Sequence, residues 1–371
     1  MLTIIVKGTN GCNLACSYCS LGEKKFFKFV DKNKLKKIFS YACECARYRN
    51  EKNVTFILHG GEPTLVSVNI YEDAIESLKK AYFDLNISFC MQTNGVRITE
   101  EFIEFAKRFE INIGVSIDGA EEVHDNERRT IAGGPSYEII TSNIDRMLKA
   151  GLNVSGLMVL TKYGYQYGYE FLNYFSIRNI HLKINPLLNY GEVYEHPELS
   201  LEQGEYAKYL IGLYEYIIEN DIAVNISPID NILIAVLNEK GIGECSFSSE
   251  CGKHFLCIDY NGDIYPCGKF SDMDKLKIGN IDNTEPGDVT AYINKKLVGR
   301  RNKKIPDKCK ECDFLHLCNG GCSAEALIDG NFNSTPILCE DYKMLFEYFY
   351  HDGMLLLKKE LQRQKKILEE R

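Results

Sequence analysis

Three cysteines near the N-terminus have a spacing that could hold a metal centre. Cys12, Cys16 and Cys19 form a C-x3-C-x2-C pattern directly after a short apolar segment, Leu2–Val6, and no fourth Cys or His follows nearby. Structural zinc normally takes four protein ligands, and ordinary ferredoxin clusters take four thiolates. Three thiolates therefore favour a [4Fe–4S] cluster whose fourth iron stays open to an external ligand, an arrangement typical of catalysis. The alternative is three unrelated buried thiols in a cysteine-rich chain.

A second group of cysteines lies in the C-terminal third of the chain. Taken alone, its Cys309-x2-Cys312 pair fits zinc as well as iron. The eight members are Cys245, Cys251, Cys267, Cys309, Cys312, Cys318, Cys322 and Cys339. The remaining four thiols are expected to be small buried side chains, although Cys257 lies between two candidate ligands; they are Cys43, Cys45, Cys90 and Cys257.

Composition excludes several classes of protein. Hydrophobic residues make up 45% of the 371 residues and charged residues 26%, which is ordinary for a globular protein. The net charge of −8, with dispersed Lys and Arg, does not suggest a nucleic-acid-binding face. The apolar run at the N-terminus is too short for a signal peptide, and no stretch approaches the length of a membrane span. Fifteen cysteines without a secretion signal indicate metal sites in a reducing compartment, so we expect a cytoplasmic protein.

The elements that must position the N-terminal thiols alternate between strand and helix through about residue 185. The expected strands are nearly continuously apolar, as in a parallel sheet covered on both faces; they are Leu2–Lys7, Asn53–His59, Asn86–Met91, Ile111–Ile117, Asn153–Leu160 and Ile180–Asn185. Amphipathic segments expected to be helical lie between them, at Asp31–Tyr48, Ile70–Phe83, Glu100–Phe109, Tyr137–Ala150 and Tyr169–Ile177. Repeated βα units predict an α/β fold with a parallel barrel or a doubly wound sheet, and six units are too few for a full eight-stranded barrel.

The second half of the chain changes character. A long helix is expected at Ser200–Asn220, then a connector to Glu244, a region rich in Cys, Gly and Asp to Cys339, and a charged amphipathic helix to the C-terminus. We therefore predict four parts: a barrel domain at 1–199, a bridging helix and connector at 200–244, a cysteine-rich domain at 245–345 and a C-terminal helix at 346–371.

The N-terminal loop resembles the cluster motif of the radical S-adenosylmethionine (SAM) enzymes. In that family an aromatic residue commonly precedes the third cysteine, as Tyr18 does here. The resemblance implies a partial six-stranded (β/α) barrel of the TIM type. It also implies that SAM binds the open iron, receives one electron and is cleaved to methionine and a 5′-deoxyadenosyl radical. That radical would then take a hydrogen atom from an unactivated C–H bond of the substrate.

The same resemblance implies a SAM pocket at the carboxyl ends of the strands. Gly60, Gly61, Glu62 and Pro63 match the family's Gly-Gly-Glu-Pro motif, which holds the amino group of SAM. Asn94, in the polar Gln92–Gly95 segment, would line the site, although turn chemistry alone could explain it. Segments 115–119 and 124–128 resemble those of the peptide-modifying branch. There Ser116 and Asp118 would reach the ribose or carboxylate, and Arg128, or its neighbour Arg129, would pair with the carboxylate.

The C-terminal cysteines resemble the SPASM domain, which carries two auxiliary [4Fe–4S] clusters. The pattern that carries the resemblance is Cys251-x10-Gly262-x4-Cys267 followed by the run of five cysteines. The resemblance implies a first cluster on Cys245, Cys251, Cys267 and Cys322, and a second on Cys309, Cys312, Cys318 and Cys339. With the radical SAM cluster, this makes three [4Fe–4S] clusters, and complete ligand sets suggest electron transfer. The alternative is a pair of zinc sites.

The resemblance also implies a reaction. Hydrogen-atom removal leaves one electron to be lost, and the auxiliary clusters would accept it, so we expect a net two-electron oxidation. The leading expectation is a crosslink or dehydrogenation in a ribosomally made peptide or protein side chain, with flavodoxin or ferredoxin as reductant. The segment before Cys12 leaves no room for a leader-binding domain, so a separate protein could present the peptide.

Alternative reactions remain open at this level. One is dehydrogenation of a sugar or aminocyclitol alcohol. Another is the formylglycine formation of sulfatase-maturing relatives, which carry an acidic residue directly after the third SPASM cysteine, where this chain has Gly268. Acidic residues such as Glu192 and Asp259 could act as a base but cannot be ranked. A non-catalytic electron carrier or zinc module is the third alternative.

Overall fold

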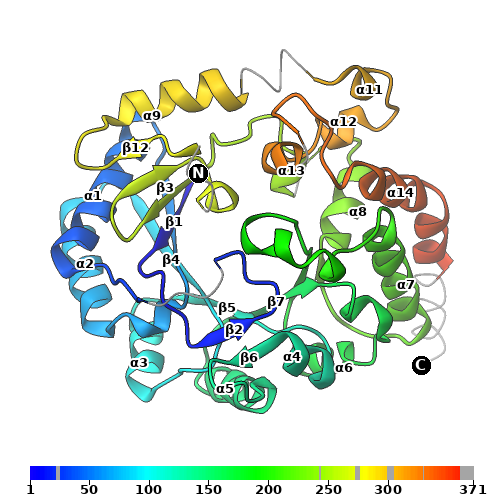
Figure 1. Ribbon diagram of the computed structural model, residues 1–371, viewed down its shortest axis with the longest axis horizontal. Coiled ribbons are helices and arrows are strands. Elements are labelled where there is room, and N and C mark those ends of the chain that lie inside the picture. The colour runs from blue at the N-terminus through cyan, green and yellow to red at the C-terminus, as the bar shows by residue number, and fades with distance from the viewer. Residues whose placement is uncertain (22–25, 242–243, 272–275, 299–304, 329, 360–371) are drawn as a thin grey trace, which may run out of the picture. The chain divides into compact units, whose positions relative to one another are not determined.

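Alternating strands and helices produce an α/β fold in the computed structural model, which describes all residues except 22–25, 242–243, 272–275, 299–304, 329 and 360–371 (Figure 1). Two compact units interleave along the chain. Unit 1 comprises Met1–Leu157, Asn189–Pro197 and Glu250–Arg300, and unit 2 comprises Met158–Leu188, Glu198–Ser249 and Arg301–Arg371. The boundaries that we drew from composition concern sequence modules and remain predictions.

The sheet of unit 1 is mostly parallel, which confirms the predicted fold class. Its strand order is β12-β11-β10-β1-β3-β4-β5-β7. The parallel set within it is β1 (Leu2–Lys7), β3 (Asn53–His59), β4 (Asn86–Thr93), β5 (Asn112–Ser116) and β7 (Val154–Leu160, to Leu157 in this unit). These five strands lie where the apolar runs predict them. Because they are parallel, their carboxyl ends meet at one edge, from which the loops with the candidate site residues emerge.

Helices lie between these strands along the chain. They are α1 (Lys32–Tyr48), α2 (Val68–Ala81), α3 (Glu100–Arg108), α4 (Glu121–Glu127) and α5 (Tyr137–Lys149). The Asp31 side chain caps α1 by accepting the backbone N–H groups of Asn33 and Lys34. Helices α1 and α2 pack side by side (Figure 1). Phe39 of α1 packs against Phe56 of β3 with ring centroids 4.7 Å apart and the ring planes tilted by 49°, so an aromatic contact joins the first helix to the sheet.

Part of the cysteine-rich region adds strands to the same sheet. Strand β10 (Phe255–Asp259) pairs in parallel with β1, with Lys7 opposite Asp259. Strand β10 forms a hairpin with β11 (Asp263–Tyr265), to which it pairs antiparallel, and β11 pairs with β12 (Gly279–Asn280). Helix α9 (Pro286–Ile293) follows, with a π-helical turn at Asn294–Val298. Cys257 on β10 is fully buried, as expected of a packing thiol.

A second, two-stranded sheet joins the cluster loop to the segment that follows α4. Strand β2 (Leu14–Cys16) pairs antiparallel with β6 (Arg128–Thr130), and Cys16 is opposite Arg128 (Figure 1). The sequence analysis did not predict this pairing, because three residues per strand are too few to show a period.

Unit 2 contains the remaining strands and most of the C-terminal helices. The end of β7, Met158–Leu160, is followed in the strand order by β8 (Leu182–Pro186), which pairs in parallel with β9 (Ile226–Ser227). The helices are α6 (Leu172–Arg178), α7 (Glu205–Glu219), α8 (Ile229–Leu237), α11 (Asp307–Lys310), α12 (Leu315–Cys318), α13 (Ser323–Ile328) and α14 (Cys339–Tyr350). The backbone is again helical at residues 352–359, and the rest of the expected C-terminal helix falls outside the described residues.

Asp341 joins two helices of unit 2. Its carboxylate accepts the backbone N–H groups of Gly204 and Ala207 at 3.2 and 3.0 Å, which caps the start of α7 from α14. Tyr214 and Phe349 pack edge to face between the same helices. Across the described ranges of both units, no helix is long and apolar enough to cross a membrane.

Candidate active site

The three N-terminal thiols lie together on the loop that follows β1 in unit 1. Burial raises the pKa of the Cys16 thiol to about 12; the Arg128 guanidinium opposes this effect, and negative charge on Cys19 and Cys12 adds to it. Burial also raises the pKa of Cys12, again with a contribution from Cys19. The three sulfur atoms are therefore within electrostatic reach of one another, as a shared iron–sulfur cluster would require. Bound iron would hold them as thiolates, whatever their pKa without metal.

Glu62 joins the turn after β3 to the end of β4. Its carboxylate is 1% exposed and accepts the Thr64 N–H, the Thr64 hydroxyl, the Thr93 hydroxyl and the Asn94 N–H, all at 2.6–2.9 Å. Burial raises the Glu62 pKa, and these hydrogen bonds oppose the increase. The carboxylate therefore fixes the loops around the pocket, and its predicted contact with SAM remains a prediction.

The paired glycines let the turn after β3 touch the cluster loop. Gly60 has φ +140°, and a Cβ there would lie 2.5 Å from the carbonyl oxygen of Thr9. A Cβ on Gly61 would lie 2.1 Å from the Gly11 carbonyl oxygen, which also accepts the Glu62 N–H at 2.7 Å. Both glycines are thus required by backbone-to-backbone packing.

Substituting Gly61→Ala is expected to destabilise this packing by about 1–3 kcal/mol, the usual cost of overpacking, because backbone must move to admit the methyl group. We expect less iron bound per chain and a lower midpoint of thermal unfolding, measured anaerobically on reconstituted protein. Gly134→Ala is the matched control, since its Cβ would meet nothing nearer than the Thr130 hydroxyl at 3.4 Å. Equal iron content in both variants would contradict the prediction.

Asp118 and Arg128 form a buried ion pair beside the cluster loop. The two side chains are 0% and 8% exposed, and Arg128 Nε donates to Asp118 Oδ2 at 2.7 Å. The Tyr18 hydroxyl donates to the same carboxylate oxygen, and the guanidinium lies over the Tyr18 ring. Arg128 Nη1 also donates to Cys16 Sγ at 3.8 Å. Arg129 is exposed, so of the two arginines it is Arg128 that faces the site.

The polar residues at the ends of β4 and β5 also turn toward this loop or toward each other. Asn94 Nδ2 donates to Cys12 Sγ at 3.6 Å and to Asn13 Oδ1 at 2.8 Å. Ser116 Oγ accepts a hydrogen bond from Gln92 Nε2 at 3.1 Å. The structure therefore brings Glu62, Asn94, Asp118 and Arg128 around the three cysteines, and their contacts with SAM remain predictions.

Sequence reasoning missed several supporting residues. His124 is fully buried: its Nδ1 accepts the Asp118 N–H at 3.1 Å, and its Nε2 lies 3.0 Å from Ser136 Oγ. Burial lowers the His124 pKa to about 4, so this imidazole is neutral and structural. A signal for it was present, because His124 is the first residue of segment 124–128, which resembles the peptide-modifying branch. Thr93 lies within the polar Gln92–Gly95 segment, whereas no pattern in the sequence marks Ser136 or Thr64.

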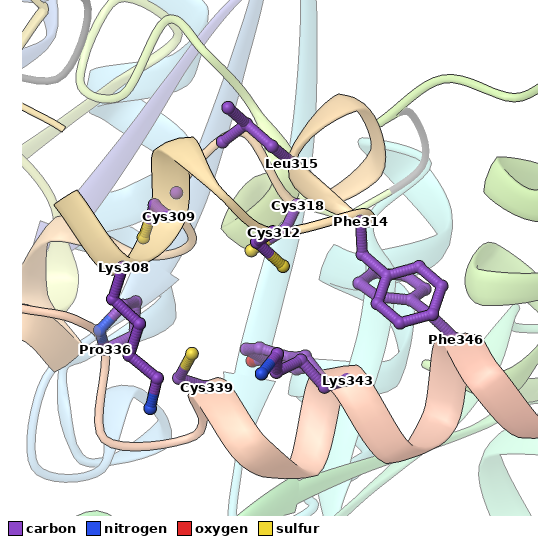
Figure 2. A pocket seen from close by; sticks show the side chains of 12 residues that line it. Lys308, Cys309, Cys312, Phe314, Leu315, Cys318, Pro336, Cys339, Lys343 and Phe346 are labelled. Atoms are coloured by element: carbon purple, nitrogen blue, oxygen red, sulfur yellow. The ribbon is translucent and has the colours of Figure 1, made fainter. Parts of the chain in front are cut away.

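Four of the C-terminal cysteines line a small hollow within unit 2. Figure 2 shows the thiols of Cys312 and Cys339 pointing into it from opposite sides. Burial raises the Cys339 pKa, with further contributions from Glu340 and Cys309, whereas Lys308 and Lys343 oppose the increase. The wall is completed by apolar side chains and two lysines, so the donor set fits a thiolate-bound cluster; the lining includes Cys309, Cys312, Cys318, Cys339, Phe314 and Phe346.

The other predicted ligand set draws on both units, with Cys245 and Cys322 in unit 2 and Cys251 and Cys267 in unit 1, and it remains a prediction. Over the parts of the chain that the structure describes, no three Cys, His, Asp or Glu side chains form a group that could hold a single metal ion.

Of the two candidate bases, Asp259 stabilises the turn after β10. Its Oδ1 accepts the N–H groups of Asn261 and Asp263 at 3.1 and 3.0 Å, and burial raises its pKa to about 6. The side chain of Glu192 lies outside the described part of the structure.

Comparison with known proteins agrees with this site. Residues 6–175 match the family model described as the radical SAM superfamily. These residues form a radical SAM domain, as the resemblance predicts, and a cysteine-rich C-terminal region follows it.

Among curated proteins, the chain is similar to two anaerobic sulfatase-maturating enzymes. The serine-type enzyme of Bacteroides thetaiotaomicron is 28% identical over 98% of this chain and 92% of its own length. The cysteine-type enzyme of Clostridium novyi is 29% identical over 93% and 94%. The solved structure of native anSMEcpe with bound AdoMet superposes with a TM-score of 0.83 at 25% identity, covering 97% of this chain and 100% of the other.

Proposed function

We propose that this radical SAM enzyme oxidises a Ser or Cys side chain of a protein substrate to formylglycine. The observation that carries the proposal is similarity along nearly the whole chain to sulfatase-maturating enzymes of both the serine and the cysteine type. A neighbouring structure of anSMEcpe holds AdoMet together with the Kp18Cys peptide, which supports a peptide substrate. From the sequence alone, formylglycine formation was only an alternative to a crosslink or dehydrogenation, and the similarity to these relatives now puts it first.

The cofactors follow from the N-terminal loop. We propose that Cys12, Cys16 and Cys19 hold a [4Fe–4S] cluster, which, with SAM bound beside it, would supply the 5′-deoxyadenosyl radical. The support is the mutual electrostatic reach of the three thiols and the AdoMet bound in the neighbouring structure. The role of the protein would be to position the cluster loop through Glu62 and Arg128 and to exclude water from the site.

Electron balance assigns a role to the C-terminal thiols. After a hydrogen atom leaves the substrate Cβ, loss of one more electron and one proton completes the oxidation. Serine then gives the aldehyde directly, and cysteine gives a thioaldehyde that water hydrolyses with release of hydrogen sulfide. The leaving electron needs an acceptor, and we place it at the four-thiol hollow of unit 2, where Cys309, Cys312, Cys318 and Cys339 would hold an auxiliary cluster.

A crosslink or a different dehydrogenation in a peptide is the second candidate. It is favoured by Gly268, which stands where sulfatase-maturing relatives are expected to have an acidic residue. A Cβ on Gly268 would lie 2.9 Å from Ile5 Cδ1, so an acidic side chain would start against an apolar one. A reaction that needs a base must then take it from a residue other than position 268. A reaction that needs no base would not be affected by glycine at this position.

Matched peptides distinguish the two candidates. Peptides spanning the modified site of a sulfatase, with Cys, Ser or Ala at that position, are incubated anaerobically with reconstituted enzyme, SAM and dithionite. Dithionite replaces the flavodoxin or ferredoxin that we propose as the physiological reductant. We expect 5′-deoxyadenosine with a hydrazide-reactive aldehyde from the Cys or Ser peptide, and no aldehyde from the Ala peptide. Loss of two hydrogens without an aldehyde would favour the crosslink, and no peptide-dependent 5′-deoxyadenosine would contradict both.

A further inference from the structure

Two side chains of unit 1 donate hydrogen bonds to cysteine sulfur atoms of the cluster loop. Asn94 Nδ2 is 3.6 Å from Cys12 Sγ, and Arg128 Nη1 is 3.8 Å from Cys16 Sγ. The family resemblance assigns both residues to SAM. Hydrogen bonds to cluster sulfurs are among the factors that set the reduction potential of iron–sulfur clusters, so these contacts have a consequence of their own.

The orientation of the Asn94 amide is fixed by its neighbours. Its Oδ1 accepts the Val96 N–H at 3.0 Å, and its own backbone N–H donates to Glu62 Oε2 at 2.7 Å. Because the oxygen is occupied in this way, the side-chain nitrogen must face the cluster loop, where Asn13 Oδ1 and Cys12 Sγ accept its two protons. The residue is 6% exposed, so water does not compete well for these bonds.

The Arg128 guanidinium is held equally firmly. Asp118 binds its Nε edge, and the Asp118 backbone N–H is held by His124. The pairing of β2 with β6 places Arg128 opposite Cys16. The guanidinium binds Asp118 Oδ2 through Nε, and its Nη1 donates to Cys16 Sγ. The planar fork allows both contacts at once, which a single ammonium group would not.

We propose that Asn94 and Arg128 are positioning residues whose N–H···S hydrogen bonds to Cys12 and Cys16 make the N-terminal cluster easier to reduce. When the cluster takes one electron from a flavodoxin, a ferredoxin or dithionite, the added negative charge spreads over its sulfur atoms. Donors that are already oriented stabilise that charge without rearrangement, and the buried setting strengthens the effect. The inference requires a cluster on this loop and no particular substrate.

The test is the midpoint potential of this cluster in reconstituted holoenzyme, measured without SAM by an EPR-monitored redox titration. The cluster's signal is identified in a parallel sample as the one that changes when SAM is added. Asn94→Ser shortens the donor so that it no longer reaches Cys12, and Arg128→Lys keeps a charge for Asp118 but loses the fork. Gly134→Ala is again the control, because a methyl group there would meet nothing nearer than the Thr130 hydroxyl at 3.4 Å.

We expect the two variants to keep their iron and the equilibrium constant for reduction to fall at least tenfold, which is about 59 mV for a one-electron couple. The control should titrate like the parent enzyme. An unchanged midpoint with normal iron overturns the proposal, as does a rise in the SAM concentration required without a change in midpoint. If one variant loses iron, the midpoint potential of the other variant tests the proposal. Loss of iron from both variants also overturns the proposal, since the two residues would then only hold the loop in place.

Discussion

Replacing Cys16 with alanine is expected to abolish SAM cleavage by the reconstituted, reduced enzyme. Cys16 ends β2, faces Arg128 across the small sheet and lies within electrostatic reach of Cys12 and Cys19. Removing one of three thiolates leaves too few ligands for a cluster with one open iron. The rate of 5′-deoxyadenosine formation should fall by more than about 100-fold. Loss of a residue that only hydrogen-bonds to a metal ligand costs up to about 100-fold, and loss of a ligand itself should cost more.

The measurement is anaerobic chromatography of 5′-deoxyadenosine together with iron content. Cys90→Ala is the matched control, because Cys90 is a half-buried thiol on β4 to which no ligand role is assigned. It should cleave SAM at nearly the parent rate. If Cys16→Ala still forms 5′-deoxyadenosine with its N-terminal cluster signal intact, the assignment of this loop is wrong.

The strands of the central sheet could be predicted because their signal is local. Strands β1 and β3 begin and end where their apolar runs do, at Leu2–Lys7 and Asn53–His59. The parallel pairing of β10 with β1 could not be predicted in the same way. The four apolar residues at 255–258 could pair at an edge of many sheets, and the choice of partner depends on tertiary packing about 250 residues away in sequence.

In the candidate site, too, some features could be predicted from the sequence and others depend on the fold. Residue type and spacing predicted the three cysteines, since chemistry restricts which side chains can bind a cluster, and the family resemblance predicted the pocket residues. Sequence does not give the partner of each polar group, however. Asp118 and Arg128 were assigned separately to a cofactor, whereas in the structure they bind each other and Tyr18. A buried charge must be paired wherever a partner lies within reach, and that partner becomes known only once the fold is known.

Replacing Cys312 with alanine is expected to separate SAM cleavage from product formation. Cys312 faces the unit 2 hollow opposite Cys339 (Figure 2), and it belongs to none of the contacts around Cys12, Cys16 and Cys19. If this hollow holds the electron acceptor, hydrogen-atom removal can still occur but the second electron has nowhere to go. We expect 5′-deoxyadenosine formation to persist while the yield of oxidised peptide falls by at least about tenfold. Tenfold is the smallest effect usually seen when a residue that supports a metal ligand is lost.

Iron content gives this prediction an independent check. Three [4Fe–4S] clusters would amount to roughly twelve irons per chain, and Cys312→Ala should lose about four of them. Cys90→Ala again provides the control and should keep both iron and product. Full product from Cys312→Ala would exclude the hollow as the electron acceptor. If 5′-deoxyadenosine is lost together with product, the hollow supports the radical SAM chemistry in some way other than by taking the second electron. Only persistent cleavage without product, at reduced iron, assigns the electron to these four thiols.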